Sequence, residues 1–177
     1  MINDRDTIVE CGAGISSIYI GALLNQIGND KKKLYTIDHD ENWLSILQRE
    51  LDQNSLSEYV TLIHAPLKHC KECAASNLKW YDTTVIQEQI FDVNIDLLFV
   101  DGPVANKKEL ELARYPALPV LKDKLSDEFL VLLHDAHRKG ETRIASKWSD
   151  ELGIKFRKSI LNGDIYIGLK GSSYNVL

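Results

Sequence analysis

Four side chains that can accept or donate a proton follow two long apolar runs in the sequence. Asp101 comes directly after IDLLFV, and His134, Asp135 and His137 stand at the end of FLVLLH or just beyond it. Carboxylates and imidazoles serve as general acids and bases, and carboxylate oxygens also hold magnesium or calcium. Continuous apolar runs of this length are typical of buried parallel strands, whose carboxyl ends border ligand sites. We therefore expect these four groups to line one site.

The same groups differ in the roles that we predict for them. A histidine is the better general base near neutral pH, so we place catalysis on His137, beyond the strand end, with Asp101 and Asp135 lining the site. His134 and Arg138 are candidate substrate contacts, since arginine can hold an anionic group through two parallel hydrogen bonds. Structural alternatives stay open, because His134 can be a core histidine and His137 and Arg138 can cap the next helix.

A second group of candidate residues surrounds a turn near the amino terminus, in VECGAGISS. Gly12 and Gly14 let the backbone approach a ligand without a Cβ in the way. A dinucleotide-binding turn has a third glycine and receives a pyrophosphate, which Glu10 would repel. Glu10 instead suits an ammonium and a sulfonium, and Asp38, which ends the next apolar run, can accept both hydrogens of a ribose diol. The ligand that combines these groups is S-adenosylmethionine.

The elements that must position these residues alternate between strands and helices. Helical apolar patterns lie between the strands, the first starting at Ser16 or Ser17 and ending at Gly28, the last ending at Gly153. KFRKSI, LNGD and IYIGLK then predict two strands joined by an Asn-Gly turn. We predict an α/β fold with a Rossmann-like, doubly wound, mostly parallel seven-stranded sheet and one antiparallel strand near the edge. Strands are expected at residues 6–11, 33–38, 59–64, 95–100 and 129–134.

Length and composition narrow the remaining possibilities. A chain of 177 residues is most simply one domain, which we assign to residues 1–177. The net charge of −5 argues against a nucleic-acid partner. No apolar run is long enough to cross a membrane and no signal peptide is recognisable, so we expect a cytoplasmic protein without a membrane partner.

Taken together, the motifs resemble those of the class I S-adenosylmethionine-dependent methyltransferases. VECGAGISS is similar to their first motif, LYTIDHD to the second, IDLLFVDGP to the fourth, and the terminal hairpin to their antiparallel seventh strand. The resemblance implies a cofactor site with Glu10, Gly12, Gly14 and Ser16 at the methionine part, Asp38 at the ribose, His39 and the backbone of Ala65 at the adenine, and Asp101 facing the sulfonium.

A narrower resemblance concerns the second half of the chain. WYD, VDGP, ARYPALPVL and HDAHRKGE are similar to segments of a group of small bacterial methyltransferases. In the catechol-type enzymes, an acid after the fourth strand and an Asp-Asn pair after the fifth bind a divalent cation. Asp101 and Asp135 could supply two such oxygens, but Ala136 stands in place of the asparagine. A divalent metal is therefore not favoured, and we assign no metal ligand.

These observations predict methyl transfer from S-adenosylmethionine to an oxygen, less readily a nitrogen, of a small molecule or glycan. Class I methyltransferases usually carry helices before the first strand that cover the substrate. Here either the site is open, which would suit a bulky acceptor such as a glycan, or segments 66–94 and 103–125 form the cover. Two alternatives stay open. One is a nicotinamide-dependent oxidoreductase, and the other is a non-catalytic protein that binds the cofactor or acts as a scaffold.

Overall fold

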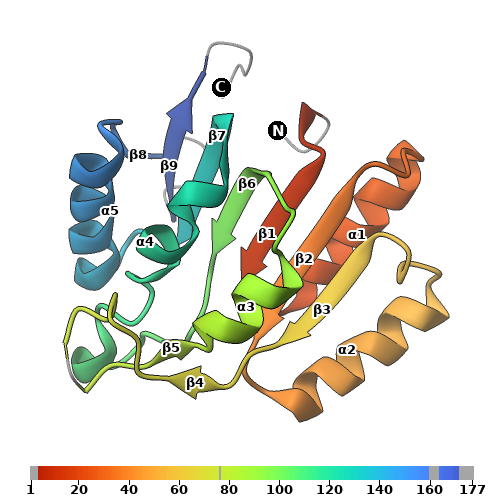
Figure 1. Ribbon diagram of the computed structural model, residues 1–177, viewed down its shortest axis with the longest axis horizontal. Coiled ribbons are helices and arrows are strands. Elements are labelled where there is room, and N and C mark those ends of the chain that lie inside the picture. Colours follow the sequence, from red (N-terminus) through yellow and green to blue (C-terminus); the bar gives the residue numbers. More distant parts are fainter. Residues whose placement is uncertain (1–3, 76, 160–163, 172–177) are drawn as a thin grey trace.

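The centre of the computed structural model is a seven-stranded sheet with the strand order β3-β2-β1-β6-β7-β9-β8 (Figure 1). Five strands run parallel, β9 runs antiparallel to β7, and β8 runs antiparallel to β9. This arrangement confirms the predicted fold. The structure describes residues 4–75, 77–159 and 164–171. The strands of the sheet are β1 (Thr7–Cys11), β2 (Lys33–Asp38), β3 (Val60–His64), β6 (Ile95–Val100), β7 (Leu125–His134), β8 (Arg157–Lys158) and β9 (Ile165–Lys170).

Four of the five predicted parallel strands agree with the observed ones to within a residue at each end. The fifth, β7, begins at Leu125 rather than at residue 129, because residues 125–128, three of which are polar, also belong to the strand. Leu125 pairs with Ile95 beside an irregularity in the register, and the Ser126 hydroxyl donates to the Asp96 carboxylate at 2.9 Å. The predicted Asn-Gly turn, at residues 162–163, lies outside the described residues.

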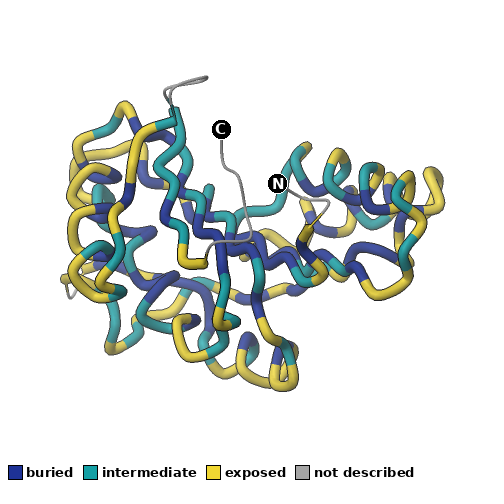
Figure 2. Tube along the Cα trace, turned by 90° about the horizontal axis from the view of Figure 1, so that it is seen from above, coloured by how far each residue is buried: buried dark blue, intermediate teal, exposed yellow. Residues whose placement is uncertain are grey.

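Helices cover both faces of the sheet. Successive side chains of a strand point to opposite faces, so the apolar strands present buried side chains to the helices on each face. Leu24 and Leu51 belong to one apolar cluster with β1, β2 and β6, while Trp148 belongs to the cluster on the other face. Figure 2 shows the buried strands as a dark layer between them. Within the described ranges, no helix is long and apolar enough to span a bilayer. The helices are α1 (Ile15–Ile27), α2 (Glu41–Gln53), α3 (Thr83–Gln89), α4 (Ala117–Leu121), α5 (Lys139–Leu152) and the 3-10 helices η2 (Lys108–Leu110) and η3 (Lys122–Lys124).

The ends of α1 and α5 carry the capping residues that set their lengths. Gly28 and Gly153 follow the two helices in the left-handed conformation, as predicted, with φ of 67° and 63°. The start of α1 differs from the prediction, because Gly14 rather than a serine occupies the N-cap. Ser17 contributes from the first turn instead, where its hydroxyl accepts a hydrogen bond from the Gly14 N–H at 3.1 Å.

A small hairpin lies beyond the edge at which β1, β2, β3 and β6 end (Figure 1). Its strands, β4 (Leu67–Lys68) and β5 (Trp80–Tyr81), pair antiparallel. Trp80 and Tyr81 are buried against the core, so the hairpin is fixed to the sheet. Two aromatic side chains thus anchor segment 66–94 at this edge of the sheet.

Candidate active site

The first glycine of the turn after β1 is required by backbone packing. Gly12 has φ of +99°, a conformation that side chains disfavour. A Cβ on Gly12 would lie 2.7 Å from the backbone nitrogen of Gly102. The Cys11 carbonyl accepts hydrogen bonds from the N–H groups of Asp101 and Gly102 at 2.9 and 2.6 Å. The backbone of the glycine turn thus packs directly against the backbone that follows β6.

The second glycine leaves an open side that leads to a buried carboxylate. A Cβ on Gly14 would meet nothing nearer than the Ser16 hydroxyl oxygen, at 3.7 Å. Glu10 is fully buried and accepts hydrogen bonds from the Ser16 and Ser17 hydroxyls at 2.5 Å and from Thr36. Burial raises the pKa of Glu10, and these donors oppose the rise. A ligand at Gly14 would therefore meet the charge of Glu10 through Ser16.

Asp38, the last residue of β2, closes the other side of the turn. Its Oδ2 accepts from the Ala13 N–H at 3.0 Å, and its Oδ1 accepts from the N–H groups of His39 and Asp40 at 2.7 and 2.9 Å. These bonds hold the Asp38 carboxylate beside the glycine turn. Ala65 is fully buried, and its N–H donates to the Asp38 carbonyl at 2.8 Å. The Ala65 N–H is thus occupied within the protein.

A cavity of about 200 Å³ opens beside His39. The ring of His39 lies 6.3 Å from that of buried Tyr81, so the hairpin and the end of β2 meet here. Carbon atoms make up most of the wall. Both candidate cover segments, 66–94 and 103–125, contribute to it. The lining residues are His39, Leu67, Asn77, Lys79, Pro103, Val104, Leu110 and Ala113.

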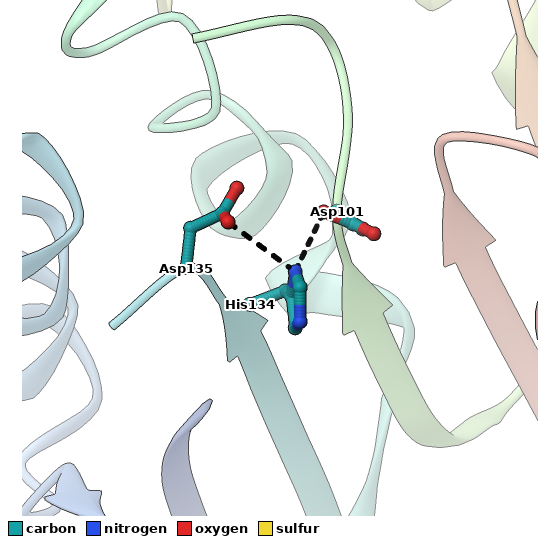
Figure 3. A group of neighbouring side chains, drawn as sticks. All are labelled: Asp101, His134 and Asp135. Atoms are coloured by element: carbon teal, nitrogen blue, oxygen red, sulfur yellow. Dashed lines mark hydrogen bonds and ion pairs between the residues drawn. The ribbon is translucent and has the colours of Figure 1, made fainter. Parts of the chain in front are cut away.

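Three of the predicted residues meet at the ends of β6 and β7 (Figure 3). His134 Nδ1 lies 3.1 Å from Asp101 Oδ1 and 3.6 Å from Asp135 Oδ1. Asp135 has φ of +62°, which is uncommon for a residue other than glycine. The chain turns sharply there, and the Asp135 carboxylate points back toward the imidazole. The structure therefore brings these three groups together at one edge of the sheet.

The centre of this group is Arg114, which the sequence patterns did not mark as a functional residue. Its buried guanidinium lies 3.1 Å from Asp101 Oδ1 and 2.8 Å from Asp135 Oδ2. It also donates to the carbonyl oxygens of Pro103 at 3.2 Å and His134 at 3.3 Å. A buried charge needs such partners. The only sequence signal was a cation within the largely apolar stretch ARYPALPVL.

Two residues at the start of α5 extend this arrangement. Arg138, the predicted substrate contact, has its Nη1 2.5 Å from Asp135 Oδ2, so it is paired inside the protein. Glu141 is fully buried and lies 3.6 Å from Arg114 and 3.9 Å from Arg138. Burial raises the pKa of Glu141, and the two arginines oppose the rise. We call the following residues the ion cluster: Asp101, Arg114, Asp135, Arg138 and Glu141.

His137 lies outside the ion cluster, on the side of the β8 and β9 hairpin. Its Nδ1 is 2.5 Å from Asp164 Oδ1, and this hydrogen bond lowers the pKa of Asp164. The His137 side chain is 63% exposed, compared with 34% for His134. The residue predicted as the general base thus stands at the rim, while His134 stands nearer the centre. No sequence pattern pointed to Asp164.

Two sets of side chains in the described part of the chain have a geometry that could hold a metal ion. One is Asp101, His134 and Asp135, and the other is Asp135, His137 and Asp164. In each set the ligand atoms lie within 4.8 Å of one another. The first set also contacts Arg114, whose positive charge competes with any cation placed there.

Residues 9–136 match the model of a family described as a methyltransferase domain. The match covers more than half of the chain, and the chain belongs to this family. The predicted methyltransferase is thereby confirmed. No curated protein matches the sequence.

Solved structures with the same fold are also methyltransferases. A protein assigned as a caffeoyl-CoA O-methyltransferase from Staphylococcus aureus has a TM-score of 0.69 at 15% identity, covering 96% of this chain and 78% of that one. A Geobacter sulfurreducens methyltransferase has a TM-score of 0.63 at 18% identity, and the match covers 97% of this chain and 73% of that one. A Bacillus cereus O-methyltransferase in complex with S-adenosylhomocysteine has a TM-score of 0.64 at 13% identity, and the match covers 96% of this chain and 76% of that one. At these identities the likeness concerns the fold.

Proposed function

We propose that this methyltransferase transfers a methyl group from S-adenosylmethionine to an oxygen, less readily a nitrogen, of a small molecule or glycan. The observation that carries the proposal is the placement of two carboxylates, Glu10 behind Ser16 and Asp38, on either side of the open turn at Gly14. An ammonium and a ribose suit these charges, whereas the pyrophosphate of a nicotinamide dinucleotide would be repelled. The arrangement favours the adenosyl ligand over the oxidoreductase alternative.

In this proposal each part of the cofactor has its own contacts. The methionine part lies over Gly14 with its ammonium toward Ser16 and Glu10. The ribose diol donates to Asp38. The adenine enters the cavity beside His39, whose largely apolar wall suits a flat ring. Asp101, at the end of β6, faces the sulfonium. The S-adenosylhomocysteine in the Bacillus cereus structure supports this choice of ligand.

S-adenosylmethionine, when bound, supplies a methyl group on a positively charged sulfur. The residues of the chain must align the acceptor and remove its proton. We assign proton removal to Nε2 of His134, because its Nδ1 faces the Asp101 carboxylate, which orients the ring. His137, held by Asp164 at the rim, is the second candidate for this role and is placed to contact the acceptor.

We also assign the chain to the small bacterial group suggested by its motifs. Each of those four segments contributes to the site in the structure. WYD provides Tyr81 beside the cavity, VDGP provides Asp101, ARYPALPVL provides Arg114, and HDAHRKGE provides His134. A single domain and a cytoplasmic location remain part of this proposal.

Calorimetric titration of the full chain tests the proposal. S-adenosylmethionine, S-adenosylhomocysteine, NADH and NADPH are titrated in parallel, and micromolar affinity is expected for the two adenosyl ligands alone. Binding of a nicotinamide cofactor instead would overturn the assignment. If the adenosyl ligands bind, a screen of hydroxylated and amino acceptors with labelled methyl groups follows. Binding without any methyl transfer would favour the scaffold alternative.

A further inference from the structure

We propose that Arg114 is the built-in cation of this site. Its guanidinium stands between Asp101 and Asp135, in the role that a divalent metal has in the catechol-type methyltransferases. Methyl transfer by this chain then needs no metal between these two carboxylates. The inference rests on the proposed function for its meaning, whereas its test requires no S-adenosylmethionine.

The guanidinium of Arg114 carries a permanent charge, and its contacts fix the position of that charge. Arginine stays protonated at every physiological pH. The side chain is 4% exposed, and carbonyl oxygens of Pro103 and His134 hold its Nε and Nη1 in addition to the two carboxylates. With Glu141, 3.6 Å away, these partners make five polar contacts from three segments, which hold the guanidinium in place. A metal ion bound by Asp101, His134 and Asp135 would lie against this charge.

One oxygen of each carboxylate that a metal would use is already engaged by arginine. Asp101 Oδ1 faces both Arg114 and His134 Nδ1, each at 3.1 Å. Asp135 Oδ2 faces Arg114 at 2.8 Å and Arg138 at 2.5 Å. Two arginines thus compensate the charge of Asp135 before any ion arrives. Magnesium and calcium bind several oxygens in their first coordination sphere, and one oxygen of each carboxylate here already faces a guanidinium.

The same contacts make Arg114 a positioning residue for His134. Its Nη2 holds the carboxylate that orients the imidazole, and its Nη1 holds the His134 carbonyl. One side chain therefore fixes both the backbone and the ring partner of the proposed base. The buried guanidinium therefore acts on the acceptor only through Asp101 and His134.

Titration of the full chain with Mn²⁺ alone, followed by the loss of the free-ion electron paramagnetic resonance signal, tests the inference. In the unmodified chain we expect no site tighter than about 1 mM that depends on Asp101. Arg114→Met removes the charge and should tighten Mn²⁺ binding by about ten-fold or more. Arg114→Lys keeps a charge and should show no gain. Arg143→Met, which removes an exposed arginine paired with Glu111, is the matched control.

Two results would overturn the inference. One is a micromolar Mn²⁺ site in the unmodified chain that disappears in Asp101→Asn. The other is a folded Arg114→Met chain whose Mn²⁺ affinity equals that of the unmodified chain. Circular dichroism establishes folding, and Arg114→Gln replaces Arg114→Met if the latter does not fold. Because the titration of the unmodified chain is decisive by itself, unfolding of both variants would still leave a supporting or contradicting result.

Discussion

In the proposed cofactor site, the Asp38 carboxylate lies between the glycine turn and the end of β2. The carboxylate accepts hydrogen bonds from three backbone N–H groups, one of which, that of Ala13, belongs to the open turn. Asp38→Asn should weaken binding of S-adenosylhomocysteine by about ten-fold or more, because the charge-assisted bonds to the ribose are lost. Asp40→Asn, at the N-cap of α2, is the control, since asparagine caps a helix as well as aspartate does. Calorimetry measures both, and equal affinities would contradict the ribose assignment.

Glu10 gives the folded protein a specific dependence on pH. Burial raises its pKa above the ordinary value of 4.5, so the folded state binds the Glu10 proton more tightly than the unfolded state does. Its contribution to stability is therefore fully present below pH 4.5 and is lost as the pH rises through the folded pKa. Glu10→Gln has no such loss, so its free energy of unfolding relative to that of the unmodified chain should increase as the pH rises above 4.5.

Urea unfolding at several pH values measures this difference. Glu88→Gln, at an exposed position on α3, should show no comparable trend. A difference between Glu10→Gln and the unmodified chain that stays constant with pH would contradict a raised pKa. The same Glu10 variant should bind S-adenosylhomocysteine more weakly, because the negative charge behind Ser16 is removed.

His134 and His137 can be separated by matched substitutions. His134→Asn should lower turnover about 100-fold or more, the usual contribution of a general base, while S-adenosylhomocysteine affinity changes only a few-fold. His137→Asn should have a smaller effect, since its ring lies at the rim. Single-turnover rates with a saturating acceptor measure both variants. The reverse order of effects would return the role of the base to His137.

The sequence predicted the residues at strand ends and missed the residue between them. Asp101 and His134 follow apolar runs, so strand geometry alone places them at one edge. Arg114 lies on a connecting segment, whose path depends on tertiary packing rather than on any period. Asp164 escaped prediction for the same reason, because the hairpin returns it to His137 across the end of the sheet.

At the scale of the elements, the turn between β1 and α1 carries two glycines with separate functions. Gly12→Ala should lower the free energy of unfolding by about 1–3 kcal/mol, because the added Cβ meets the Gly102 backbone at a positive φ. Gly14→Ala should leave stability nearly unchanged and weaken cofactor binding, since its Cβ enters the open side. Chemical denaturation and calorimetry on both variants separate the effects. A Gly14→Ala chain with full affinity would show that the ligand lies elsewhere.

The regular elements were predictable where one physical signal dominated. Continuous apolar runs gave β6 and the second half of β7, and glycine gave the ends of α1 and α5. The strands β4 and β5 have two residues each, too few for any period to be recognised. Residues 126–128 of β7 are polar, and the strand extends over them to Leu125, which pairs with Ile95 only in the folded structure.

At the scale of the whole molecule, strand order explains why the two halves of the site meet. β1 and β2 lead to the proposed cofactor side, while Asp101 and Asp135 of the ion cluster follow the ends of β6 and β7. From β1 the chain continues to β2 and β3 on one side of the sheet, and it then returns to β6 on the other side of β1. In such sheets, ligands bind at the carboxyl ends of the strands where the strand order changes direction. The methyltransferase site therefore follows from topology, and its particular chemistry follows from the side chains placed there.

The pairing of β1 with β6 also determines when this protein can become stable during synthesis. Ile8 pairs with Leu97, so one side of the first strand lacks its partner until more than half of the chain has been made. Until then β1 is an edge strand with unpaired backbone groups, and the glycine turn lacks the Gly102 backbone on which it packs. The nascent amino-terminal half is consequently exposed to misassociation on the ribosome, and productive folding must wait for a long-range contact.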